Sequence, residues 1–501
     1  MELSLLQSLF FLLLLLLPLL LYLFFHQDSA KTPITHGLKS YPILGYLPHY
    51  IRNRHRFLEW STEILIRSPT HTMGFKTAAL VGGVITANPL NVEHMLKTNF
   101  GNYPKGKLSI SMLEDFLGHG IFNSDGEQWR RQRKAASFEF NKRSLRNFVV
   151  ETVQFEIVER LLPLLRSAQE KDEIVDLQDV LERFGFDNIC NVAFDEDPGC
   201  LTSGDADMDF MKAFGEAQNL VMDRFMSPIK VAWRIKKLLN IGSERRLREL
   251  FSVIHNYSTK IIRAREQKAI EHKSDLLSRF AFNGEHNEES LRDVVTNFIL
   301  AGRETTSSAL TWFFWIISTR PDVADKIVQE VKSIRASSQD SSVTTFSYED
   351  LGEMHYLHAA ISESLRLYPP VAMDTQSCDG DDTMPDGTFV GKGWFVSYSA
   401  YAMARVEAIW GEDCNEYKPE RWLEDGIFKP VSPFRYPVFH AGPRMCLGKE
   451  MAYIQMKSIV ACVLERFKIS VVGKEGTPEH ILSLTLRMKG GLPVKVMKTE
   501  E

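Results

Sequence analysis

Apolar residues recur at helical spacing through most of the chain after Ser61. A repeat of three to four residues places such side chains on one face of a helix. The longest run, 290–319, ends just before Pro321, whose ring does not fit a helix interior. The pattern predicts helices over 113–117, 129–150, 153–165, 175–190, 247–265, 290–319 and 450–467.

Strand signals are fewer and shorter. Runs at 79–86 and 388–399 have the composition of strands. The C-terminal run 482–496 alternates and contains Gly490 and Gly491, which predicts a hairpin. The expected fold class is therefore mainly α with small β-sheets.

The first 25 residues follow a different pattern. Residues 3–25 are apolar except for Ser4, Gln7 and Ser8, and they carry no charge. About 20 apolar residues are enough to cross a hydrocarbon core of roughly 30 Å. The alternative is a cleaved signal peptide, which would have a basic start and a shorter apolar run. This chain begins with Glu2 and no lysine or arginine, so we expect one retained N-terminal transmembrane helix.

The residues after this run indicate the orientation of the chain. Basic residues follow it, and they predict that the bulk of the protein stays on the cytoplasmic side. Pro33, Pro42, Gly45 and Pro48 predict a stiff, non-helical connector. No long linker or repeat follows residue 60. We therefore expect a membrane anchor over 1–28, a proline-containing hinge over 29–60 and one catalytic domain over 61–501.

Composition narrows the function classes. The chain has 501 residues, of which 44% are apolar and 25% charged, as in a large globular protein. The net charge of −5 argues against nucleic acid as a main target. The six cysteines form no C-x-x-C pair and are too sparse for a disulfide framework. A reducing compartment without a zinc site is the simpler interpretation.

One cysteine lies in an unusual loop, FHAGPRMCLG at 439–448. Glycine has no Cβ and lets a backbone approach a large flat ligand, as Gly442 and Gly448 would here. Arg444 is able to neutralise an anionic group on that ligand. Cys446 precedes a helical run, and a helix N-terminus stabilises a thiolate. The alternative is a buried free cysteine with no ligand.

A second motif, AGRETT at 301–306, lies in the middle of the longest helical run. Ala301 and Gly302 would leave a shallow groove on one helix face. The Thr305 hydroxyl has two options, the i−4 carbonyl or a water in the groove. Glu304 could connect that water to a supply of protons. The alternative is close helix packing through small residues.

Charged motifs complete the set. Glu363 and Arg366 lie at i and i+3 of a predicted helix, and Arg421 follows in PERW at 419–422. The segment 130–146 carries seven basic residues and one acidic residue. Such a run is either a partner surface or an ordinary solvated helix face.

Together the motifs F-x-x-G-x-R-x-C-x-G, A-G-x-E-T-T, E-x-x-R, P-E-R-W and W-x-x-x-R, which includes Trp129 and Arg133, resemble those of the cytochrome P450 monooxygenases. The resemblance implies the P450 fold and a haem b cofactor. Cys446 is then the axial thiolate on the haem iron. The implied cofactor-binding residues are Cys446, Arg444, Trp129, Arg133, Phe439, Gly442, Gly448, Ala301 and Gly302.

The resemblance also implies roles for the remaining motif residues. Thr305 and Glu304 would deliver protons, and Glu304 replaces the aspartate of many relatives. Glu363, Arg366 and Arg421 would form a structural ionic triad behind the haem. The rivals are a hydroperoxide isomerase on the same fold and a non-catalytic membrane-tethered binding protein. The isomerase often lacks the threonine, and the binding protein would not need both Cys446 and Thr305.

Three further segments resemble the plant clan of fatty-acid ω-hydroxylases, which includes oxidases of jasmonoyl-isoleucine and of sterol side chains. They are NYPKGK at 102–107, GIFNSDG at 120–126 and FGFDNIC at 184–190. The resemblance implies hydroxylation at the terminal carbon of a lipid chain, with fatty acids first. The alternatives are C-26/27 hydroxylation of cholesterol or 22-hydroxycholesterol and 12-hydroxylation of jasmonoyl-isoleucine.

The resemblance implies pocket walls at 108–118, at the helix groove and at 371–375, where Asp374 is an odd polar member. The chain contains no dinucleotide or P-loop motif, so an oxygenase of this kind needs electrons from a partner. The implied partner is NADPH-cytochrome P450 reductase, which would meet the basic run. The implied location is the endoplasmic reticulum membrane, with one membrane span and a cytoplasmic catalytic domain.

Overall fold

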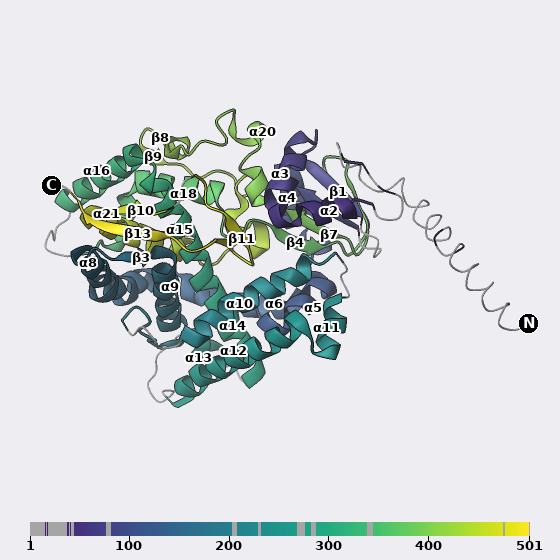
Figure 1. Cartoon of the computed structure of the whole chain (residues 1–501), viewed down its shortest axis with the longest axis horizontal. Helices are drawn as coiled ribbons and strands as arrows, with labels where there is room; N and C mark the ends of the chain where they lie inside the picture. The colour runs from purple at the N-terminus through teal and green to yellow at the C-terminus, as the bar shows by residue number, and fades with distance from the viewer. Residues whose placement is uncertain are drawn as a thin grey trace, which may run out of the picture.

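The computed structural model describes most of the chain after residue 45 (Figure 1). The described residues are 16, 18, 38, 39, 41, 45–76, 82–202, 208–228, 232–267, 276–281, 287–337, 344–473 and 476–499. Within these ranges every helix is too short or too polar to cross a bilayer. The predicted anchor falls almost wholly outside the described residues, so it stays a prediction.

Helices make up most of the described chain, and the expected mainly α class is confirmed. Several are joined by 3₁₀ or π-helical turns, labelled η. The α-helices are α2 Leu47–Asn53, α3 Phe57–Arg67, α4 Pro89–Glu93, α5 Gly106–Leu117, α6 Gly126–Ser137, α7 Lys142–Asn147, α8 Leu162–Glu170, α9 Leu177–Phe194, α10 Met208–Phe225, α11 Ala232–Leu239, α12 Gly242–Gln267, α13 Leu276–Ala281, α14 Glu288–Ile299, α15 Thr305–Ser318, α16 Pro321–Ser337, α17 Tyr348–Glu353, α18 His355–Leu367, α19 Ala400–Met403, α20 Glu407–Trp410 and α21 Lys449–Arg466.

The sheets are small and lie towards the sides of the helical body (Figure 1). The largest has the order β1 Thr72–Lys76, β2 Gly82–Thr86, β7 Phe395–Tyr398 and β4 Asp374–Ser377. A second has the order β10 Phe467–Val471, β13 Pro493–Lys498 and β3 Ile174–Asp176. The remaining pairs are β11 His480–Leu482 with β12 Leu486–Met488, β5 Asp382–Thr383 with β6 Phe389–Val390, and β8 Leu423–Glu424 with β9 Ile427–Phe428.

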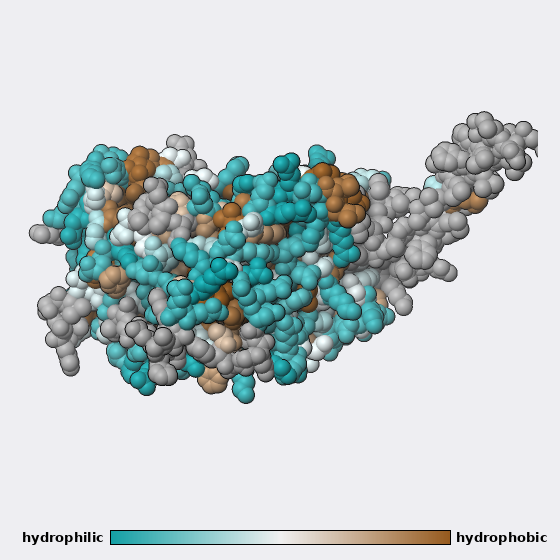
Figure 2. All heavy atoms as spheres, turned by 90° about the horizontal axis from the view of Figure 1, so that it is seen from below, coloured by the Kyte–Doolittle hydropathy of each residue, from teal (hydrophilic) through white to brown (hydrophobic). Residues whose placement is uncertain are grey.

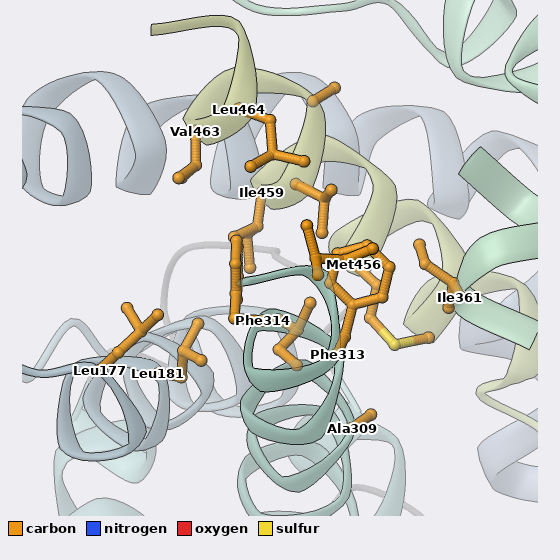
Figure 3. Close-up of a cluster of buried hydrophobic side chains, with 14 of the residues drawn as sticks. Leu177, Leu181, Ala309, Phe313, Phe314, Ile361, Met456, Ile459, Val463 and Leu464 are labelled. Carbon is orange, nitrogen blue, oxygen red and sulfur yellow. The ribbon is translucent and has the colours of Figure 1, made fainter. Parts of the chain in front are cut away.

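The main core forms where α15 crosses α9, α18 and α21 (Figure 3). Helix α15 is apolar on nearly every face, as expected of a helix that is buried all round. Its Phe314 lies near Ile459 of α21 on the side that faces Leu181 of α9, and its Phe313 lies beside Met456 of α21. Burial of each such side chain stabilises the fold by about 1.5–3 kcal/mol. The face shown in Figure 2 is mainly hydrophilic where its residues are described, and its hydrophobic areas are interrupted by polar ones.

The prediction of one continuous helix over 129–150 is wrong. The helix breaks after α6 into the 3₁₀ turn η5 (Phe138–Phe140), helix α7 and the π turn η6 (Phe148–Val153). Asn141 causes the break, because its side chain accepts hydrogen bonds from the backbone N–H groups of Arg143 at 3.0 Å and Ser144 at 3.1 Å. Asparagine is favoured at such a helix start and disfavoured inside a helix.

The predicted helix over 175–190 begins two residues late. Val175 lies in β3 and pairs with Val494 of β13. Helix α9 then starts after Asp176, which accepts a hydrogen bond from the Gln178 backbone N–H at 3.0 Å. The strand was missed because its partner lies more than 300 residues away in the sequence, where local periodicity gives no signal.

The strand predictions need three corrections. Gly490 and Gly491 do not close a hairpin, since they connect β12 to β13 of a different sheet, and the C-terminal hairpin is β11 with β12. The run 388–399 splits into β6 and β7, with Gly393 at φ +78° in the turn between them. Strand β2 fits the run 79–86, of which 79–81 lie outside the described residues, and β1 was missed.

The long helix over 290–319 is present but interrupted. It starts at Glu288, two residues early, because Asn287 accepts a hydrogen bond from the Ser290 N–H at 2.9 Å. Residues Leu300–Glu304 form the π-helical turn η8 between α14 and α15. Single π turns inside helices are frequent at functional sites.

The expected hinge is partly helical. Helix α2 begins at Leu47, with Pro48 in its first turn. Proline is tolerated there because that turn has no partner for the missing N–H. The non-helical connector therefore ends before Leu47, and the boundaries of the anchor and hinge stay predictions.

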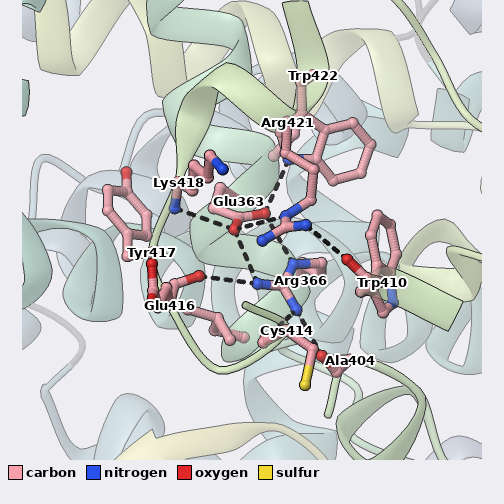
Figure 4. Close-up of polar contacts among 12 residues, drawn as sticks. Glu363, Arg366, Ala404, Trp410, Cys414, Glu416, Tyr417, Lys418, Arg421 and Trp422 are labelled. Atoms are coloured by element: carbon pink, nitrogen blue, oxygen red, sulfur yellow. Dashed lines mark hydrogen bonds and ion pairs between the residues drawn. The ribbon is translucent and has the colours of Figure 1, made fainter. Parts of the chain in front are cut away.

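A buried ion-pair network joins α18 to the 3₁₀ turn η9 (Pro419–Trp422) (Figure 4). Glu363 and Arg366 are 0% and 1% exposed. The Glu363 carboxylate accepts from Arg366 Nε at 2.7 Å and Nη2 at 2.8 Å, and from Arg421 Nε at 3.3 Å. Its oxygens also accept from Trp422 Nε1 at 2.9 Å and from the Lys418 backbone N–H at 3.1 Å. The three residues of the predicted triad are therefore in contact.

Arg366 extends this network to the chain between α19 and η9. Its guanidinium donates to the backbone carbonyls of Ala404, of Cys414 at 2.7 Å and of Glu416 at 3.1 Å. One carboxylate and one guanidinium therefore fix a segment that has little regular structure of its own. Removing one partner of such a buried pair leaves an uncompensated charge.

We predict that Glu363→Gln lowers the free energy of unfolding by about 3–5 kcal/mol, because Arg366 and Arg421 lose their shared carboxylate. Urea unfolding followed by far-UV circular dichroism measures the change. The matched control is Glu479→Gln, which removes an exposed pair with Lys489 and should have little effect. Equal losses in the two variants would contradict a special role of the buried network.

Candidate active site

The cysteine loop is closed by its own backbone. It lies between the 3₁₀ turn η10 (Pro437–Phe439) and α21. The Cys446 N–H donates to the Phe439 carbonyl at 2.8 Å, and the Phe439 ring packs 5.3 Å from the Tyr453 ring of α21. Gly448 immediately precedes α21 and accepts from the Ala452 N–H at 2.8 Å. The sulfur is thus held just ahead of a helix N-terminus.

The electrostatic setting of Cys446 suits a ligand at the sulfur. Its side chain is open to solvent, yet surrounding protein atoms raise the pKa of its thiol. The two facts agree for a sulfur that faces a recess in the protein. The Gly448 backbone N–H and the charges of Arg133 and Lys449 act in the opposite direction and lower the pKa. A bound metal cation would favour the thiolate outright.

The two loop glycines have different roles. Gly442 has φ +66°, and a Cβ there would lie 1.9 Å from the Leu96 carbonyl of the π turn η3 (His94–Thr98). Packing against η3 therefore requires glycine at this position by itself, and the predicted approach of Gly442 to a flat ligand stays a prediction. A Cβ on Gly448 would have only ordinary contacts, 3.5 Å from Phe140 and 3.9 Å from the Cys446 sulfur.

Trp129, Arg133 and Arg444 come together beside this loop. The Arg444 guanidinium lies 4.4 Å from the centre of the Trp129 ring, and that of Arg133 lies 5.9 Å from it. Arg133 Nη2 donates to the Met445 carbonyl at 2.6 Å. Arg444 Nη2 pairs with Asp125 at 2.7 Å, a partner that the motifs did not reveal. Two guanidinium groups on one indole suit the carboxylates of a haem, so the donor set fits this cofactor.

A second cluster beside the loop was missed in the sequence. The Asp374 carboxylate accepts a hydrogen bond from Lys105 Nζ at 2.7 Å, and His440 Nε2 lies 3.2 Å from the same carboxylate. Burial would raise the pKa of Asp374, but Lys105 and His440 hold it well below its usual range. The charge of Asp374 is therefore compensated by its neighbours, which explains why a carboxylate is tolerated in the segment expected to line the lipid pocket. His440 itself has φ +61°, a strained conformation for a residue with a side chain.

In the groove helix, the structure shows which bond the Thr305 hydroxyl makes and which neighbour Gly302 packs against. The Thr305 hydroxyl donates to the Ala301 carbonyl at 2.7 Å, which is the i−4 option. A Cβ on Gly302 would lie 2.6 Å from the Ile189 side chain, and one on Gly185 would lie 3.1 Å from the Arg303 carbonyl. Gly302 therefore serves close packing against α9, the alternative interpretation of the motif.

Glu304 points into the protein. It is buried and pairs with Arg303 Nη1 at 2.6 Å. The groove segment and the cysteine loop share one apolar cluster, which contains Leu300 and, at its border, Leu447. Thr305 and Cys446 are thus placed on elements that flank the same part of the interior.

A cleft of about 1460 Å³ lies elsewhere, between α5, α6, α12 and the first half of α14. Its lining includes Phe116, Arg248 and Asp293, but not Cys446 or Thr305. Burial raises the pKa of Asp293 to about 6. The many charged groups distinguish this open cleft from the apolar chamber that a lipid chain needs, although residues of the expected wall 108–118 border it.

Comparison with known proteins agrees with this geometry. Residues 35–492 match the family model described as Cytochrome P450. The chain is 51% identical to Cytochrome P450 CYP94D108 of Paris polyphylla over 456 residues, which cover 90% of each chain. It is 45% identical to Cytochrome P450 94B1 of Arabidopsis thaliana, over 94% of this chain and 93% of that one.

A more distant relative extends the comparison. Cytochrome P450 86B1 of Arabidopsis thaliana is 41% identical over 92% of this chain and 86% of its own. The match thus runs from before α2 to beyond β12 and takes in the loop of Cys446 and the turn of Thr305. The protein belongs to the cytochrome P450 family and is a haem monooxygenase of the plant group formed by families 94 and 86.

Proposed function

We propose that this P450 hydroxylates the terminal carbon of a lipid chain, and that fatty acids are its substrates. One observation carries the proposal: the three segments that resemble ω-hydroxylases all contact the site. Lys105 of the first pairs with Asp374, and Asp125 of the second pairs with Arg444. Ile189 of the third packs on Gly302. The segments typical of the clan therefore border the reaction centre.

Cys446 would hold the haem through its sulfur, and Arg444, Trp129 and Arg133 would hold the propionates. When bound, the haem supplies the iron chemistry that activates O₂ and inserts one oxygen atom into a C–H bond. The protein supplies the thiolate, the position of the substrate and the protons. The loop hydrogen bond between Cys446 N–H and the Phe439 carbonyl fixes the backbone from which the sulfur projects.

We assign to Thr305 the role of holding the groove water through which protons are delivered. Its hydroxyl donates to the Ala301 carbonyl at 2.7 Å, which leaves the oxygen lone pairs free to accept from a water in the groove. Glu304 is the adjacent acid and would supply the proton to that water. Each proton that leaves this pair must be replaced from solvent.

The terminal position demands a narrow passage. A primary C–H bond is stronger than its secondary neighbour, so unguided chemistry prefers the penultimate carbon. The protein must present only the last carbon and hold it to within about 0.5 Å. Apolar side chains of α5, of the end of α14 and of the start of η8 are available for this passage: Met112, Phe116, Leu117, Phe298 and Leu300.

Sterol side chains and jasmonoyl-isoleucine remain the alternatives within this reaction type. The side chain of cholesterol or of 22-hydroxycholesterol also ends in methyl groups, at C-26/27, and would need a wider chamber for the rings. Jasmonoyl-isoleucine would be oxidised at C-12. A hydroperoxide isomerase would not need Thr305, so the hydroxyl at this position supports a monooxygenase.

The electron donor in this proposal is NADPH-cytochrome P450 reductase. The basic residues Arg130, Arg131 and Lys134 are exposed on α6, the helix whose Arg133 contacts the cysteine loop. An acidic flavoprotein on this surface would approach the thiolate side of the haem.

The rate of the first electron transfer from this reductase, measured by stopped flow, should fall as the salt concentration rises, and a rate independent of salt would contradict the proposal.

The predicted membrane location has support from the surface. Helix α11 has exposed apolar residues beside basic ones, a composition that suits a lipid interface. Tyr50 of α2 donates to the Met226 carbonyl just after α10, so α2 lies against the region that leads into α11. The exposed apolar residues near this region are Ile51, Ile235, Leu238, Leu239 and Ile241. The single span and the endoplasmic reticulum location are proposals on this basis.

We predict that Thr305→Ala keeps haem and substrate binding but wastes reductant. Product formation should fall by roughly 10²-fold or more, because general acid effects are of this size, while NADPH consumption falls far less and peroxide appears. The matched control is Thr311→Ala, which removes the same kind of bond, to the Ser307 carbonyl at 2.7 Å, farther along the helix. Unchanged coupling in Thr305→Ala would remove Thr305 from the mechanism.

We predict that mass analysis of products from lauric to oleic acid finds hydroxylation mainly at the terminal carbon. Cholesterol, 22-hydroxycholesterol and jasmonoyl-isoleucine belong in the same panel, each compared with the fatty acids by kcat/KM. A preference for one of these compounds would replace fatty acids as the substrate. Products hydroxylated within the chain or on a ring would contradict terminal oxidation whichever substrate was accepted.

A further inference from the structure

Four charged side chains meet behind the groove helix. We call them the buried charge cluster: Glu182 of α9, Arg303 and Glu304 of the π turn η8, and Arg487 of β12. Arg303 Nη2 binds Glu182 Oε2 at 3.0 Å, and Arg303 Nη1 lies 2.6 Å from Glu304 Oε1. Arg487 Nε donates to Glu182 Oε1 at 3.0 Å, and its Nη2 reaches the same oxygen.

The cluster is deeply buried and electrically balanced. Glu304, Arg303 and Glu182 are 1%, 2% and 5% exposed, and the Arg487 side chain is 24% exposed. Two carboxylates face two guanidinium groups, and charges at this depth persist only when they are paired. The pairing is unequal, since Arg303 is shared by both carboxylates and Arg487 binds only Glu182.

Glu182 and Arg487 are held firmly by the backbone around them. Strand β12 is fixed to α15, because Ser308 Oγ and Trp312 Nε1 both donate to the Leu486 carbonyl, at 2.7 Å and 3.0 Å. Helix α9 approaches η8 closely through Gly185. Glu182 therefore has a fixed position and two bonds from Arg487, whereas Arg303 is the one ion-pair partner of Glu304 among the described residues.

We propose that Glu182 is a positioning residue for proton delivery, because it keeps Arg303 paired whenever Glu304 turns towards Thr305. The inference rests on the proposed role of Glu304 and Thr305. To reach the groove water, the Glu304 carboxyl must leave Arg303. Without Glu182 that movement would strand a buried guanidinium, which is costly. With Glu182 in place, Arg303 keeps one carboxylate, and Glu304 is released at little cost.

The proton balance of this step is simple. Glu304 starts as a carboxylate beside Arg303 and takes up a proton from solvent when it turns away. It then gives this proton to the water or hydroxyl at Thr305. The carboxylate that results turns back and is stabilised by Arg303. Glu182 stays charged throughout and touches neither the substrate nor the reacting atoms.

The two partners of Glu182 predict effects of opposite sign. In Glu182→Gln, Arg303 has one charged partner left and holds Glu304 more tightly. We expect product per NADPH to fall about tenfold, a part of the full general acid effect, with a larger solvent isotope effect on turnover. In Arg487→Gln, Glu182 loses its second charged partner and keeps its ion pair with Arg303. Coupling should then stay at or above the wild-type value.

The test measures NADPH consumption, product, peroxide and the solvent isotope effect in reconstituted holoenzyme with reductase and lauric acid. The substrate-induced shift of the haem spectrum checks that binding is intact, and Glu304→Gln serves as the reference. Uncoupling in Glu304→Gln without uncoupling in Glu182→Gln overturns the inference and leaves the proposed function standing. Full coupling in Glu304→Gln overturns the inference together with the assigned proton role of Glu304, while the terminal hydroxylation is tested separately by the products.

A purely structural role predicts a different outcome. Both Glu182→Gln and Arg487→Gln would then lose thermal stability, and neither would change the isotope effect. Glu182→Asp keeps the charge and should recover coupling towards the wild-type value, and it replaces Glu182→Gln if that variant does not fold. Uncoupling in Glu182→Asp as severe as in Glu304→Gln, or strong uncoupling in Arg487→Gln, overturns the inference.

Discussion

The whole arrangement depends on holding one cysteine sulfur at a fixed angle in a recess of the protein. The Cys446 loop has little regular structure, so neighbouring elements must hold it. Its N–H binds the Phe439 carbonyl, and Gly442 lies against the Leu96 carbonyl, where no side chain would fit. Behind it, Tyr453 of α21 meets Ser362 of α18 at 2.9 Å, on the helix that carries the Glu363 network. The network thus supports the loop through α18.

Close packing through glycines also shapes the other side of the site, at the groove helix. Gly185 lets α9 approach the backbone of the π turn η8, and Gly302 makes room for the Ile189 side chain of α9. This contact brings Glu182 within reach of Arg303 and creates a place where two carboxylates share one guanidinium. In the proposed mechanism close packing and proton delivery are therefore linked, because the small residues that shape the helix pair also set the surroundings of Glu304.

Helical periodicity predicted α6, α12, α21 and the long helix formed by α14 and α15, because it is a local signal, but it gave no prediction for α10 or α16. The sequence missed features that depend on distant partners. Strand β3 pairs with β13, Asp125 pairs with Arg444, and Glu182 pairs with Arg487, each across about 300 residues or more. It also did not identify Leu96 and Ile189 as the packing neighbours of Gly442 and Gly302, since a motif indicates that glycine is needed but not which neighbour requires it. Asn141 was visible in the sequence, and its capping role could have predicted the break after α6.

The central claim is that the sulfur of Cys446, and no other cysteine, binds the haem iron. The most direct measurement is the spectrum of the reduced, CO-bound protein for the wild type, for Cys446→Ala and for Cys462→Ala, a buried cysteine of α21 that serves as control. We predict the thiolate-type band in the wild type and in Cys462→Ala, and its loss in Cys446→Ala together with all oxygenation. A Cys446→Ala protein that kept the thiolate-type band would contradict the account.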